Sequence, residues 1–104
     1  MNAKAVKLLM AAMPLLVGCA GLTPAEEAQA AEQVASTVIA RVYPGINVPP
    51  MASCVRDNAT ADELSSLASY RDQVIGGAAQ ELTLRIVDRA ETDACIRANG
   101  IILG

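Results

Sequence analysis

Apolar residues recur at intervals of three and four in the first half of the chain, which is the spacing of one face of an α-helix. The capping box Thr23-Pro24-Ala25-Glu26 would begin this helix and Tyr43-Pro44-Gly45 would stop it, so a helix is expected over 24–42. Residues 25–33 are only Ala, Glu and Gln. We expect them to form an exposed stalk, the alternative being that their Ala face packs in the bundle. The apolar face comprises Ala31, Val34, Ala35, Val38, Ile39 and Val42.

Two shorter helices are expected in the middle of the chain. After a Pro-rich loop over 45–50, Pro50 can open a helix from Met51 to about Asn58 that carries Cys54. A second capping box, Thr60-Ala61-Asp62-Glu63, would begin another helix, which Gly76-Gly77 would end. Its apolar stripe, with Arg71 on the edge, would comprise Leu64, Leu67, Ala68, Val74 and Ile75.

The last helical stretch begins near Ala78 and ends at the C-cap Asn99-Gly100. Thr92 can cap a separate segment over 93–98, and the apolar residues 101–103 can fold back on the helix. Segment 82–87 is also compatible with a strand, but charges spaced by four favour a helix. Those charges are Glu81, Arg85 and Arg89, and the expected apolar face is Ala79, Leu82, Ile86, Val87 and Ala90. The pattern therefore predicts an all-α fold, a small bundle of three to four short helices.

The first twenty residues follow a different pattern. Lys4 and Lys7 precede ten uncharged, mostly apolar residues over 8–17, and small residues follow. This is the layout of a signal peptide. The apolar run is about half the length that a membrane-spanning helix needs, roughly 20 residues, so a transmembrane anchor is disfavoured.

The end of that run, Leu16-Val17-Gly18-Cys19, resembles the lipobox of bacterial lipoprotein precursors. The resemblance covers this segment alone. It implies cleavage between Gly18 and Cys19, a diacylglyceryl group on the Cys19 thiol and an acylated new amino terminus. In that family an Asp after the Cys favours the inner membrane. Ala20 stands there instead, so we expect the outer membrane, facing the periplasm. The alternative is ordinary cleavage after Ala20, which would give a soluble periplasmic protein.

These features divide the chain into three parts. Residues 1–18 would be a signal peptide, 19–33 a lipid anchor and stalk, and 34–104 a small disulfide-bonded helical domain.

Once Cys19 is lipidated or removed, Cys54 and Cys95 remain as a pair. In an oxidising envelope compartment such a pair usually forms a disulfide, so we expect one here; the alternative is two buried free thiols.

Composition excludes several kinds of chemistry. The 104 residues contain no His, which excludes an imidazole base and a His-ligated metal site. With two Tyr as the only aromatic residues and a formal charge of −3, binding to nucleic acid is not expected. The only Lys residues are Lys4 and Lys7, so residues 19–104 carry a formal charge of −5 and no amine for a Schiff base or a polybasic membrane contact. Membrane attachment would rest on the lipid chains.

No catalytic, cofactor or metal site is predicted. Asp57, Asp62 and Glu63 cluster around a turn, but their spacing matches no calcium loop, and two of them suit the first turn of a helix. Ser65 and Ser66 have no His or Lys to activate them. We therefore predict that the protein is not an enzyme.

An internal echo relates the two later cysteines. Cys54-Val55-Arg56-Asp57-Asn58-Ala59 and Cys95-Ile96-Arg97-Ala98-Asn99-Gly100 share Cys, a β-branched residue, Arg, any residue, Asn and a small residue. In the structural interpretation each copy is a final helical turn, with the β-branched residue inward, Arg near the C-terminal dipole and Asn as a cap. In the functional alternative the disulfide brings Arg56 and Arg97 together to contact an anion or an acidic partner.

The predicted function is that of a small cell-envelope lipoprotein, a structural or interaction subunit of an envelope protein complex. Its partners would be the membrane, through the lipid on Cys19, and an envelope protein. The alternative is a soluble periplasmic binding module or one that loosely resembles small acid-stress chaperones, whose acids would neutralise at low pH and expose apolar surface. A third hypothesis, inhibition of a partner enzyme or toxin, has only the negative charge in its favour.

Overall fold

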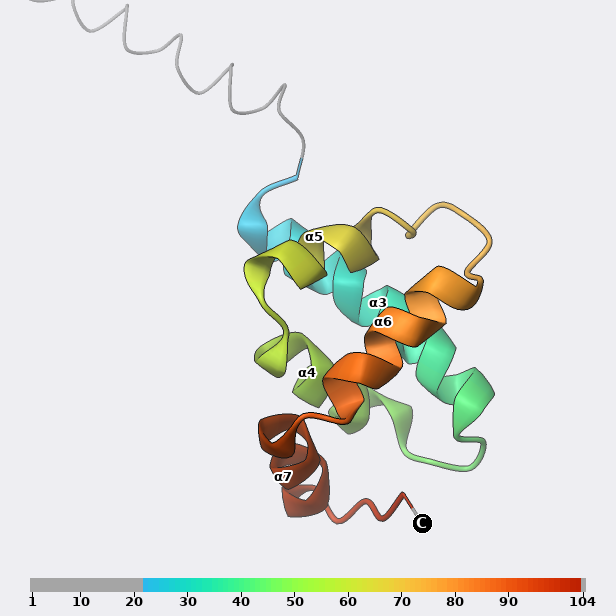
Figure 1. The fold of residues 1–104 in the computed structure, drawn as a ribbon, viewed down its shortest axis with the longest axis vertical. Coiled ribbons are helices and arrows are strands. Elements are labelled where there is room, and N and C mark those ends of the chain that lie inside the picture. The colour runs from blue at the N-terminus through green and yellow to red at the C-terminus, as the bar shows by residue number, and fades with distance from the viewer. Residues whose placement is uncertain (1–21, 104) are drawn as a thin grey trace, which may run out of the picture.

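The computed structural model describes residues 22–103, which fold into five α-helices without a strand in that range (Figure 1). The predictions on the signal peptide and on Cys19 lie outside the described residues. The all-α prediction is confirmed, including a helical conformation for segment 82–87. The helices are α3 (Pro24–Val42), α4 (Val48–Asn58), α5 (Ala61–Ala68), α6 (Gly77–Val87) and α7 (Ala90–Ala98).

Helix α3 is the centre of the bundle, and α4, α5 and α6 all pack against it (Figure 1). Its capping box forms as predicted: the Glu26 amide donates to Thr23 Oγ1 at 3.1 Å, and the Thr23 amide donates to Glu26 Oε1 at 3.0 Å. The buried face of α3 is apolar throughout and comprises Ala30, Ala31, Val34, Ala35, Val38 and Ile39.

The exposed part of α3 is shorter than the predicted stalk. Ala30 and Ala31 are only 2% and 1% exposed, and Ser65 of α5 donates a hydrogen bond to the carboxylate of Glu27 at 3.2 Å. The boundary expected after residue 33 is therefore wrong. The end of that segment packs through its Ala face because α5 covers it, which was the alternative interpretation.

Helix α4 begins at Val48, three residues before the predicted start at Met51, and it ends at Asn58 as expected. Both Pro49 and Pro50 lie in its first turn. The first amides of a helix have no carbonyl partner within it, so prolines fit there without loss of a hydrogen bond.

Helix α5 is shorter than predicted. Its capping box forms between Thr60 and Glu63, but the helix ends at Ala68 rather than at Gly76-Gly77. The Ser69 hydroxyl donates to the Ser66 carbonyl at 2.6 Å, and a side chain that takes up a helical carbonyl in this way competes with helix propagation. Val74, expected in the core, is therefore in a loop and 95% exposed.

The predicted last helical stretch is two helices. Gly76 and Gly77 begin α6 instead of ending α5, and this helix ends at Val87. Arg89 occupies the N-cap position of α7 without a capping hydrogen bond from its side chain, so Thr92, expected as the cap, lies in the first turn and is buried. Ala90 is exposed because it begins the new helix.

In place of Ala90, the core contains Thr83, whose hydroxyl donates to the Ala79 carbonyl at 2.8 Å. This hydrogen bond satisfies the buried hydroxyl within its own helix.

The C-terminal end of α7 closes as predicted. Gly100 has a φ of +76°, and its amide donates to the Arg97 carbonyl, while the Ile101 amide donates to the Ile96 carbonyl. This pair of bonds is a Schellman motif, and it turns Ile101 back onto the core, where it is buried.

Replacing Gly100 by Ala should destabilise the protein by about 1 kcal/mol, because a Cβ is unfavourable at this positive φ even though no atom obstructs it. Gly77→Ala is the matched control. It lies at the start of α6 in equally open space without a positive φ, and should be neutral or stabilising by a few tenths of a kcal/mol. Urea unfolding of both variants measures the difference, and equal effects would contradict the assignment.

Candidate functional site

Cys54 of α4 and Cys95 of α7 form the predicted disulfide, with their Cα atoms 5.7 Å apart. The bond joins positions separated by 41 residues in sequence, so the loop that it closes contains all of α5 and α6. It fixes α7 on α4 at the end of the molecule where the last described residues also lie (Figure 1).

The two echo segments have the same local structure around this disulfide. The Asn58 side chain donates to the Cys54 carbonyl at 2.9 Å, and the Asn99 side chain donates to the Cys95 carbonyl at the same distance. The β-branched residues Val55 and Ile96 are buried, as the structural interpretation predicts. The two similar segments thus end their helices in the same way, with an Asn side chain bonded to the carbonyl of a half-cystine.

Arg56 and Arg97 are each engaged with carboxylates of their own surroundings. Arg56 contacts Glu32 of α3 at 2.7 Å and Asp57 at 3.0 Å, and hydrogen bonding to Asp57 raises its pKa above the ordinary value. Arg97 pairs with Asp93, one turn earlier in α7, at 2.9 Å. The two guanidinium groups therefore have separate carboxylate partners, and this arrangement does not favour the shared anion contact of the functional alternative.

A partly buried ion pair, which the sequence pattern did not indicate, joins α5 to the break between α6 and α7. Arg89 donates to both carboxylate oxygens of Glu63 and also, at 2.9 Å, to the carbonyl of Asn58. The Glu63 side chain is 15% exposed. The hydrogen bonds from Arg89 lower the pKa of Glu63 from 4.5 to about 2.

The spacing of Glu81, Arg85 and Arg89 correctly indicated a helix, but Arg89 was wrongly placed in it because α6 ends at Val87. Arg89 stands at the N-cap position of the next helix, and its side chain pairs with Glu63, a residue 26 positions away. Such a pairing depends on how the helices are arranged, so no local signal could have found it.

Within the part of the chain that the structure describes, no three Cys, Asp or Glu side chains are grouped closely enough to hold a metal ion. Of the helices between Leu22 and Leu103, none combines the length and the apolar character that a membrane crossing requires.

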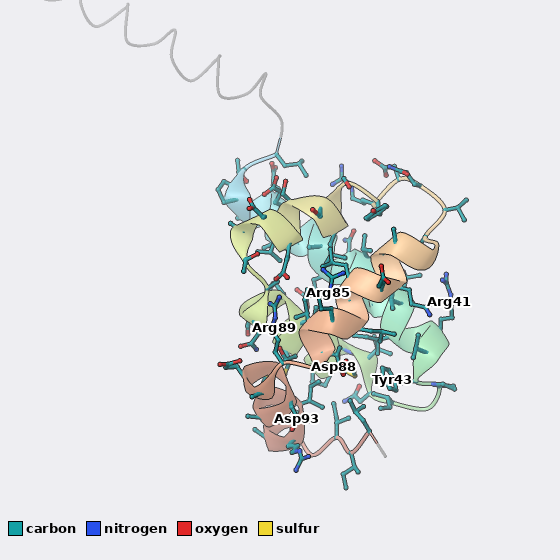
Figure 2. All side chains as sticks on the ribbon, viewed as in Figure 1. Arg41, Tyr43, Arg85, Asp88, Arg89 and Asp93 are labelled. Carbon is teal, nitrogen blue, oxygen red and sulfur yellow. A yellow bond between two sulfur atoms is a disulfide. The ribbon has the colours of Figure 1, made fainter. Side chains whose placement is uncertain are left out.

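Two open hollows adjoin at the α7 end of the molecule, and we call them together the α7-end site. One, of about 460 Å³, is lined by Tyr43, Val87, Asp88, Ala90, Asp93 and Leu103. The other, of about 320 Å³, shares Asp93 and Leu103 with it and adds Arg97, Ile101 and Ile102. Figure 2 shows Tyr43, Asp88 and Asp93 gathered at this end.

The α7-end site combines apolar and acidic groups. Ile102 is 86% exposed. Burial raises the pKa of the Tyr43 hydroxyl, and the negative charge of Asp88 raises it further, so the field of that carboxylate reaches across the hollow. The lining of the α7-end site thus brings together carboxylates, a phenol hydroxyl and aliphatic side chains.

Comparison with protein-family models, with curated proteins and with solved structures found no match to this chain.

Removal of the disulfide in C54S/C95S should lower the free energy of unfolding by about 4 kcal/mol, because the bond restricts a long loop in the unfolded chain. Denaturant unfolding with and without reductant measures this. Cys19→Ser is the control, since it removes a cysteine and keeps the disulfide. A double variant within 1 kcal/mol of the oxidised protein would contradict the expectation.

The Glu63 ion pair should make stability depend on pH. Its contribution is complete above pH 4.5 and disappears as the pH falls toward 2, because the pKa is lower in the folded than in the unfolded chain. That contribution is at most about 3 kcal/mol. Urea unfolding between pH 6 and pH 2 should show E63Q less stable than wild type at pH 6 and close to it at pH 2. D62N, an exposed change in the same turn, should follow the wild type. Parallel curves for E63Q and wild type would refute this.

Proposed function

We propose that the chain is a small cell-envelope lipoprotein whose helical domain is a structural or interaction subunit of an envelope protein complex and carries out no catalysis. The observation that carries the proposal is the arrangement of the two ends of the domain. Helix α3 begins at one end, close in sequence to the lipidation position Cys19, and the α7-end site lies at the other (Figure 1). An anchor at Cys19 would leave this site facing away from the membrane.

The disulfide supports placement in the envelope. Disulfides persist in oxidising compartments such as the periplasm and are rare in the cytosol. A pair of half-cystines that joins α4 to α7 therefore fits the lipobox-like segment Leu16-Val17-Gly18-Cys19, which implies export.

The Glu63–Arg89 pair weighs against an acid-switched chaperone. A carboxylate with a pKa of about 2 keeps its charge through moderately acidic conditions, so this link between α5 and the start of α7 would persist there. A soluble binding module remains the alternative that the fractionation experiment below tests.

Intact-mass analysis of membrane and soluble fractions tests the anchor. The wild type should be membrane-bound with a triacylated mass starting at Cys19, and its mass should rise by that of two hydrogen atoms when the disulfide is reduced. Cys19→Ser should move to the soluble fraction with its disulfide intact. In mild detergent the wild type should elute with a partner, above monomer size. An unlipidated soluble wild type would refute the anchor, and elution only as a monomer would refute the role as a subunit.

A further inference from the structure

The last described residues form a ridge at the α7-end site. Ile101 is buried and fixes the ridge on the core, whereas Ile102 projects into solvent and Leu103 is half-buried. Hollows adjoin this ridge: Ile101 and Ile102 line one hollow of the α7-end site and also a third hollow, of about 410 Å³, whose other lining residues are Asn99, Gly100 and the loop from Gly45 to Asn47. An exposed aliphatic side chain that lines hollows offers area to an apolar side chain of a partner.

The charge beside the ridge is negative and incompletely neutralised. Asp88 is exposed, and among the described residues no cationic side chain pairs with it. Within residues 22–103, Asp93 pairs only with Arg97, whose side chain is 75% exposed, and such exposed pairs are easily exchanged. The hydroxyl of Tyr43 lies within the field of Asp88 and can accept a hydrogen bond. A cation that entered this hollow would find a carboxylate and a hydroxyl oxygen together.

We propose that the α7-end site binds a segment of the partner subunit that carries a Lys or Arg next to an aliphatic side chain. The cation would lie between Asp88 and Tyr43, and the aliphatic group would pack on Ile102 and Leu103. The formal charge of −5 over residues 19–104 would favour the approach of such a segment over an acidic one. This inference rests on the proposed role as a complex subunit and names the chemistry of the contact.

A matched pair of exposed apolar positions allows a direct test in intact envelopes. Photoreactive benzoylphenylalanine is placed in the full chain at position 102 or at position 74, because Val74 is as exposed as Ile102 but lies in the loop between α5 and α6, away from α7. Asp88→Asn and Asp72→Asn are then combined with the probe at 102; Asp72 is an exposed carboxylate of that same loop.

Cross-linking to the partner should be about fivefold stronger from position 102 than from 74. Asp88→Asn and high salt should each reduce it severalfold, Asp72→Asn should not, and the partner peptide attached at 102 should contain a Lys or Arg.

Equal products from both positions, no effect of Asp88→Asn, or an attached peptide without a cation would overturn the inference. A wild type that elutes with a partner but gives no product at 102 overturns this inference alone. Elution only as a monomer overturns the proposed function as well.

Discussion

Burial of one face of α3 is the constraint on which the rest of the structure depends. Three other helices pack against it, and three of the six side chains on that face are Ala, which lets the neighbouring backbones come close. The side chains that fill the space between the helices are aliphatic and fully buried, among them Ile39, Met51, Leu67 and Ile86. Because no Phe or Trp is present, the core depends on the number of close aliphatic contacts rather than on a few large rings.

A connected set of polar contacts complements this core on the side of α4. Arg89 bonds to Glu63 and to the carbonyl of Asn58, and the Asn58 side chain bonds to the carbonyl of Cys54, which is linked to α7. The end of α4, the beginning of α5 and the break before α7 are therefore held at one place. These contacts help to hold α7, which packs mainly on α4, in a defined position from which it can support the site at its end.

Features with a local cause could be predicted from the sequence. The two capping boxes and the end of α7 at Gly100 depend on residues within one turn of each other. The disulfide was predicted because Cys54 and Cys95 remain as a pair once Cys19 is set aside. The end of α5 was predicted too late because the apolar spacing continues to Val74. The helix ends earlier because the Ser69 hydroxyl hydrogen-bonds to the carbonyl of Ser66. The Arg89 contacts and the α7-end site were missed because both are assembled from segments distant in sequence. Local pattern thus identified most elements, and tertiary packing decided where they stop and which charges meet.

The disulfide also affects when the domain can become stable. Small domains have total stabilities of 5–15 kcal/mol, so a bond that contributes about 4 kcal/mol supplies a large share. With both thiols reduced, α7 would keep its packing on α4 and α6 and the hydrogen bond from Arg89 to the Asn58 carbonyl, but it would lose the covalent link, and the chain would spend more time open. Under the proposed export, the chain would stay loosely folded while its thiols are reduced. The domain, with the ridge at Ile102, would become fixed once the disulfide forms.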